Sequence, residues 1–151
     1  MILTITIVLF CLFILFHILY MFIPLYTSCT YKRIYPKKEK GISILIPAYN
    51  ETLVIENCLM GILNVNYKNF EILFINDGST DDTLETFQKN LMLIKTPMSK
   101  QGVLSHEKVK EIYRSQKFPS IWVIDKENGG KADALNTGIE FASKEIIITL
   151  D

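Results

Sequence analysis

The sequence predicts an α/β domain with a mainly parallel sheet, preceded by one membrane-spanning helix. Two observations support this prediction. The first 31 residues are mostly apolar and contain no charged side chain, whereas the rest of the chain mixes apolar runs with charged residues. From Gly41 onward, short apolar runs alternate with segments whose apolar residues recur every three or four positions, which is typical of parallel strands joined by helices.

The apolar run from Ile2 to Ile23 is long enough to cross a bilayer, which takes about 20 residues. A cleaved signal peptide is the alternative, but no positively charged segment precedes the run and no small-residue cleavage site follows it. We therefore expect a retained anchor over residues 1–26, with the lipid bilayer as a partner.

A basic juxtamembrane linker is expected over residues 27–40. It carries five basic residues against the single acidic Glu39. The basic residues are Lys32, Arg33, Lys37, Lys38 and Lys40. Because positive residues beside a membrane helix stay on the cytoplasmic side, we expect a membrane protein whose domain lies in the cytoplasm.

The composition of residues 41–151 narrows the function. This part holds 11 basic and 15 acidic side chains, so it is mildly acidic, whereas a nucleic-acid-binding domain is usually basic. We expect no nucleic-acid partner. The chain has three cysteines, and this small, odd number does not make a disulfide framework.

Four apolar runs bounded by turn residues predict buried strands. They cover residues 42–46, 71–75, 120–124 and 145–150, and Pro47 is expected to close the first. Helices are expected between them, over residues 52–65, 80–91 and 131–143. Ser79 and Asp82 resemble a capping box at the start of the second helix.

Apolar stripes predict which helix faces are buried. The stripe of the first helix is Ile55, Leu59 and Ile62, and that of the last is Leu135, Ile139 and Ala142. The polar segment 92–119 does not fit the alternation. We expect it to be an excursion at the edge of the sheet, with an amphipathic helix over residues 103–116.

Polar clusters follow all four predicted strands. They are residues 47–51, 76–79 and 125–131, and Asp151. Ligands of open parallel sheets bind at the carboxyl ends of the strands, so we expect these clusters to form one pocket.

The side chains of these clusters suit a nucleotide. Tyr49 offers a flat ring for stacking a base, and Asp77, on the turn after its strand, can accept hydrogen bonds from a base or a sugar. The helix after Gly129 and Gly130 offers free N–H groups to a diphosphate, and Lys131 adds a cation. Taken singly, each residue also fits a turn, core or surface role; their convergence favours a site.

Asp151 is a candidate metal ligand, although it also fits a simple chain end. Carboxylate oxygens together with substrate phosphates commonly hold Mg²⁺ or Mn²⁺. Other phosphate and metal motifs are excluded. The chain has no G-x-G-x-x-G, Ala132 follows Gly130-Lys131 where a P-loop needs Ser or Thr, and the segment from Asp77 lacks the Gly and Glu of a calcium loop.

Together, these motifs resemble those of family 2 glycosyltransferases. The matching stretches are Ile44–Glu51, Ile75–Asp81, Lys126–Asn136 and Ile147–Asp151. With a membrane helix in front, the chain most resembles the membrane-bound synthases of poly-N-acetylglucosamine, hyaluronan, chitin and cellulose. The resemblance implies a GT-A fold, a UDP-sugar donor, a glycan acceptor and transfer with inversion, in polysaccharide synthesis.

The resemblance also implies roles for individual residues. Pro47, Ala48, Tyr49 and Glu51 border the base and ribose in such enzymes, and Asp77 contacts the uracil or ribose.

The remaining roles concern the diphosphate and the metal. By resemblance, Gly130 and Lys131 lie beside the diphosphate, and Asp151 aligns with the first Asp of the Asp-x-Asp motif that holds ribose and Mg²⁺ or Mn²⁺.

The family's second metal-binding Asp and its catalytic base come after the position of Asp151. We therefore expect residues 41–151 to be the nucleotide-binding half of the domain, truncated before the acceptor-binding half and inactive alone. A downstream subunit or the missing half is then an expected partner. The alternative is a catalytically inactive remnant or split subunit that binds nucleotide or other proteins.

Overall fold

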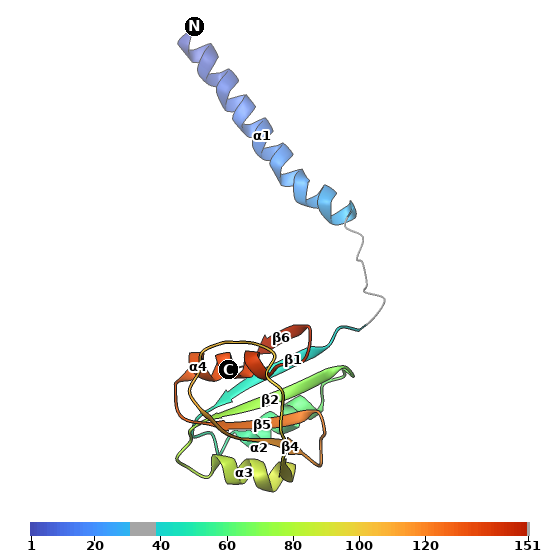
Figure 1. Ribbon diagram of the computed structural model, residues 1–151. Coiled ribbons are helices and arrows are strands. Elements are labelled where there is room, and N and C mark those ends of the chain that lie inside the picture. The colour runs from blue at the N-terminus through green and yellow to red at the C-terminus, as the bar shows by residue number, and fades with distance from the viewer. Residues whose placement is uncertain (31–38, 151) are drawn as a thin grey trace. The chain divides into compact units, whose positions relative to one another are not determined.

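The computed structural model describes residues 1–30 and 39–150. The chain divides into two compact units, residues 1–37 and residues 38–151. The first contains helix α1 (Ile2–Thr30), whose segment Ile2–Pro24 is long and apolar enough to cross a membrane (Figure 1). The basic residues 32–38 of the predicted linker lie outside the described part.

Two polar side chains of α1, those of Thr6 and His17, hydrogen-bond within the helix itself. Thr6 Oγ1 donates a hydrogen bond to Ile2 O at 2.8 Å, and His17 Nδ1 donates one to Phe13 O at 2.9 Å. These bonds give the two side chains partners that an apolar environment would not supply.

In residues 39–150, six strands form one sheet in the order β3-β4-β5-β2-β1-β6, with helices on both faces (Figure 1). The elements are β1 (Ile42–Ala48), α2 (Ile55–Leu63), β2 (Phe70–Asp77), α3 (Thr83–Leu91), β3 (Leu93–Lys95), β4 (Val109–Ser115), β5 (Ile121–Lys126), α4 (Lys131–Phe141) and β6 (Ile146–Thr149). Strands β5, β2, β1 and β6 run parallel, and β4 is antiparallel to both of its neighbours, β5 and β3. The predicted α/β class and mainly parallel sheet are confirmed.

Alternating residues of the central strands supply two cores. Helices α2 and α3 cover one face, where the rings of Phe74 and Phe87 lie 4.8 Å apart. Helix α4 covers the other face, over Leu45, Leu73 and Ile75. The predicted stripe of α2 is confirmed, because its three residues are all buried.

The predicted stripe of α4 is partly wrong. Ile139 is 38% exposed and Leu135 is only partly buried, whereas Ala134 and Gly138 are buried. A Cβ added at Gly138 would lie 3.0 Å from Ile75 Cδ1. Small residues therefore let α4 lie close to the sheet, and the larger side chains sit beside the contact.

The predicted helix over residues 103–116 is also wrong, although residues 92–119, which include the edge strand β3, do lie at the sheet edge as expected. Residues Val109–Ser115 form strand β4, between β3 and β5. A bulge between Val109 and Glu111 puts Val109 and Ile112 on the α4 face, while Tyr113 packs on the other face. The bulge changes the two-residue period of the strand to an apparent helical spacing.

Two smaller predictions at element boundaries are wrong. Strand β1 continues through Pro47, because its ladder with β6 ends at Leu45 and the missing N–H costs no bond there. The capping box does not form. Ser79 Oγ accepts a hydrogen bond from Asn50 N at 3.0 Å. The side chain of Asp82, the N-cap residue of α3, makes no capping hydrogen bond.

We expect Phe87→Ala to lower the free energy of unfolding by about 3–5 kcal/mol, because it empties a fully buried ring position against Phe74. Leu53→Ala is the control, since Leu53 is 91% exposed and its loss should cost less than about 0.5 kcal/mol. Urea unfolding of the full chain in detergent, followed by Trp122 fluorescence, measures both. Equal stability of the two variants would contradict the core assignment.

Candidate functional site

A cavity of about 430 Å³ lies at the carboxyl ends of β1 and β2, beside the start of α4. We call it the strand-end pocket. Its lining residues are Pro47, Ala48, Tyr49, Glu51, Asp77, Asn128, Gly130, Lys131 and Ala134. The structure thus brings together all the proposed site residues that it describes, and Asp151 lies outside the described residues.

The loop after β1 is fixed to the loop after β2. Asn50, which has a φ of 56°, donates its N–H to Ser79 Oγ at 3.0 Å, and its Oδ1 accepts the N–H of Thr80 at 2.8 Å. These bonds tie Asn50 to the loop after β2. Tyr49 is consequently presented at the pocket with half of its surface exposed, and Glu51 lines the pocket beside it.

The sequence predicted that Asp77 lies on the turn after its strand. In the structure Asp77 is instead the last residue of β2 and only 3% exposed. Its Oδ1 accepts hydrogen bonds from Lys126 Nζ at 2.7 Å and Gly129 N at 3.1 Å, and its Oδ2 accepts one from Gly130 N at 2.7 Å. The N–H groups of the two glycines that precede α4 are therefore occupied. A carboxylate has about four acceptor positions, so about one remains for a ligand.

The two glycines are required by this geometry. Gly130 has a φ of +84°, in the region that favours glycine. A Cβ at Gly129 would lie 2.5 Å from Asp133 Oδ2. The glycine pair therefore allows the backbone to turn onto the Asp77 carboxylate before α4 begins.

Lys126 is a charged residue that the sequence analysis missed. Its side chain is fully buried, with Nζ 2.7 Å from Asp77 Oδ1 and 2.6 Å from Asp133 Oδ2, and it also donates to Glu127 O. Burial by itself lowers the pKa of Lys126, but hydrogen bonds and charges of Asp133 and Asp77 outweigh it and raise the pKa. The available signal was its register, because Lys126 is paired directly with Asp77 across the β2–β5 ladder.

The pKa of Asp133 is lowered, whereas that of Lys126 is raised. Burial raises the pKa of its carboxyl, but the hydrogen bonds from Lys126 and from the N–H of Glu107, together with the charge of Lys126, outweigh that effect and hold the pKa below the ordinary value. Lys126 is thus a charged ammonium between two carboxylates, one of which lines the strand-end pocket.

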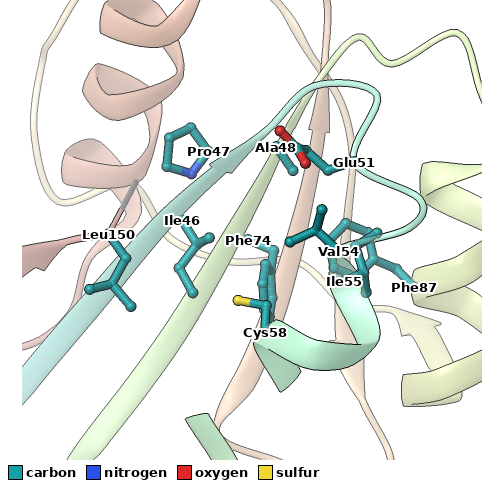
Figure 2. Close-up of a pocket in the computed structure, with 10 residues that line it drawn as sticks. All are labelled: Ile46, Pro47, Ala48, Glu51, Val54, Ile55, Cys58, Phe74, Phe87 and Leu150. Carbon is teal, nitrogen blue, oxygen red and sulfur yellow. The ribbon is translucent and has the colours of Figure 1, made fainter. Parts of the chain in front are cut away.

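A second cavity, of about 390 Å³, adjoins the strand-end pocket and is mainly apolar (Figure 2). It shares Pro47, Ala48 and Glu51 with that pocket and extends between α2 and Leu150. Burial raises the pKa of the Cys58 thiol in its lining, which keeps that thiol protonated. Lys131 lines the strand-end pocket, whereas Glu51 is the sole charged residue among the described residues lining this cavity, so an anionic nucleotide fits the strand-end pocket better.

Comparison with known proteins agrees with this geometry. Residues 43–94 match the family described as Glycosyl transferase family 2. The chain belongs to that family. Over 112 residues, or 74% of its length, it is 37% identical to poly-beta-1,6-N-acetyl-D-glucosamine synthase of Staphylococcus aureus strain COL. It is 34% identical over 113 residues, again 74% of its length, to the enzyme of the same name from Staphylococcus epidermidis.

This family 2 chain spans about a fifth of its curated relatives, since the match covers 21% of each synthase. Solved structures share its fold. A mannosyltransferase from Pyrobaculum calidifontis, in complex with GDP-Man and Mn²⁺, superposes on 86% of this chain and 33% of its own, with a TM-score of 0.56 and 21% identity. Staphylococcus aureus TarS 1–349 matches 74% of this chain and 27% of its own, with a TM-score of 0.53 and 20% identity. The fold is therefore GT-A-like.

The described residues do not by themselves make a metal site. Across residues 1–30 and 39–150, no group of three His, Cys, Asp or Glu side chains is placed to hold an ion. Within the strand-end pocket, Asp77 already accepts three hydrogen bonds. A metal ion at this pocket would therefore need ligands beyond the described residues.

We expect Gly130→Ala to destabilise the domain by about 1–3 kcal/mol, because its φ of +84° with ψ of 171° strains any residue with a Cβ. Gly61→Ala is the matched control. Gly61 lies inside α2 with open space where a Cβ would go, so this change should stabilise by about 0.5–1 kcal/mol. Thermal unfolding of both variants checks the prediction, and a stabilised Gly130→Ala would rule out the backbone conformation described for the pocket.

Proposed function

We propose that this chain is the nucleotide-sugar-binding portion of a membrane-anchored glycosyltransferase that transfers a sugar from a UDP-sugar to a glycan acceptor, with inversion, in polysaccharide synthesis. The observation that carries the proposal is the strand-end pocket. Proposed base-, ribose- and diphosphate-binding residues from three separate strand ends all line one cavity there.

The pocket offers a different kind of contact to each part of the donor. The half-exposed ring of Tyr49 provides a face for the base, and the remaining acceptor position of Asp77 suits a base N–H or a ribose hydroxyl. Lys131 begins α4, where the helix dipole favours negative charge, and its ammonium suits the diphosphate.

In the proposed reaction an acceptor hydroxyl attacks the sugar carbon from the side opposite the diphosphate, which leaves as UDP. Lys131 and the N-terminus of α4 stabilise the charge that develops on this leaving group. The residue that takes the acceptor proton is not assigned within residues 1–151. We propose Asp151 as the first ligand of an Mg²⁺ or Mn²⁺ ion, in line with the Mn²⁺ of the mannosyltransferase complex.

The proposed location is a membrane, with the domain on the cytoplasmic side, where it would bind the nucleotide-sugar donor. Support comes from the length and apolar composition of α1 and from the basic residues that follow it in the sequence.

We expect the full chain, purified in detergent, to bind UDP in calorimetry and to bind GDP and ADP more weakly. Tyr49→Ala should reduce UDP affinity by about tenfold or more, because stacking of a base on an aromatic ring contributes about 1–3 kcal/mol. Tyr49→Phe is the matched variant that keeps the ring and should keep the affinity.

Two results would count against this assignment. UDP binding that is unchanged in Tyr49→Ala would place the base elsewhere. Absence of UDP binding by a correctly folded wild-type chain would leave the inactive remnant or interaction module as the better description.

We expect a reporter fused after Lys40 to lie in the cytoplasm, because the basic residues 32–40 should stay on that side. Exchanging the basic residues of this segment for neutral ones, with α1 unchanged, should weaken this preference. A reporter on the outer side in the wild-type fusion would contradict both the orientation and the access to cytoplasmic nucleotide sugars.

A further inference from the structure

A buried ion-pair triad lies beneath the strand-end pocket. Lys126 Nζ lies between Asp77 Oδ1 and Asp133 Oδ2, at 2.7 Å and 2.6 Å. The Lys126 side chain is fully buried, and those of Asp77 and Asp133 are 4% and 18% exposed. Lys126 is absent from the pocket lining, so it reaches a ligand only through a neighbour.

The triad joins the last residue of β2 to the first turn of α4. Asp77 holds the N–H groups of Gly129 and Gly130, which lead into that helix, and Asp133 lies on the helix itself. Without the ammonium, two carboxylates would face one another in a buried region, and their repulsion would separate the two elements.

Asp133 also connects the triad to residues 101–107, a segment that is hydrogen-bonded to α4. Its two carboxylate oxygens accept the N–H of Glu107 at 3.0 and 3.1 Å. Farther along the same helix, Asn136 donates to Ser105 O at 3.2 Å. The carboxylate of Glu140 accepts a hydrogen bond from His106, and its backbone oxygen accepts the N–H of Gln101. The segment therefore holds α4 at Asp133, Asn136 and Glu140.

Accordingly, we propose that Lys126 is a positioning residue for nucleotide binding: it orients the Asp77 carboxylate so that one acceptor position faces the strand-end pocket. This inference rests on the proposed function. Lys126 acts through Asp77, and Asp133 chiefly balances its charge and anchors it to α4. The ligand it serves is a nucleoside diphosphate with a base N–H or ribose hydroxyl to donate.

The first test measures amide hydrogen exchange over residues 127–131 in the full chain without ligand. We expect Lys126→Met to raise exchange there by about tenfold, because a misplaced Asp77 releases the N–H groups of Gly129 and Gly130. Lys126→Arg, which keeps the charge, should recover most of the protection. Should Lys126→Met not fold, Lys126→Met combined with Asp133→Asn removes the second carboxylate and carries the same measurement.

The second test is a double-mutant cycle on UDP affinity. Lys126→Met should weaken UDP binding by about tenfold in the wild-type background and have almost no further effect in an Asp77→Asn background, since contacting residues are not additive. Asp133→Asn is the matched control. It alters the same triad but leaves the bond between Lys126 and Asp77, so UDP affinity should change by less than about threefold.

The outcomes separate the positioning role from the proposed function. Wild-type exchange and wild-type UDP affinity in folded Lys126→Met would overturn the inference, as would losses that add fully to those of Asp77→Asn. A loss in Asp133→Asn as large as that in Lys126→Met would show a merely structural triad. A wild-type chain that does not bind UDP would defeat the proposed function, while exchange over residues 127–131 would still decide whether Lys126 holds Asp77.

Discussion

The carboxylate of Asp77 is the interaction on which the candidate site depends. It ends a strand whose apolar residues are buried on both faces, and it accepts hydrogen bonds from Lys126, Gly129 and Gly130. Hydrogen bonds to a charged group contribute about 1.5–3 kcal/mol each, and a buried carboxylate without them would be costly. The start of α4 is thereby fixed to the end of β2, and Lys131 is placed at the pocket.

The parallel strand order sets the second constraint. Because β1, β2 and β5 are neighbours and run in the same direction, the segments that follow them leave the sheet at one edge. The two loop contacts of Asn50 then bring Tyr49 and Glu51 to the same cavity. Residues far apart in the sequence thus reach one pocket through backbone topology, and few side-chain contacts are needed to hold them.

Much of this arrangement follows from local sequence patterns. Apolar runs located β1, β2, β5 and β6, and the convergence of strand ends placed seven candidate residues in one pocket. What the sequence could not supply were contacts between distant segments. The hydrogen bonds from the glycine amides to Asp77 were not predicted, because Asp77 lies more than 50 residues away from them. The bulge in β4 and the close contact at Gly138 were hidden for the same reason.

The central claim is that a nucleoside diphosphate binds the strand-end pocket, with its base beside Tyr49 and its phosphates beside Lys131. A crystal structure of the protein with UDP tests it most directly. The account predicts UDP in that pocket, with the base or ribose donating a hydrogen bond to Asp77 and the bonds from Gly129 and Gly130 intact. UDP bound elsewhere, for example in the adjoining apolar cavity beside Cys58, would contradict it.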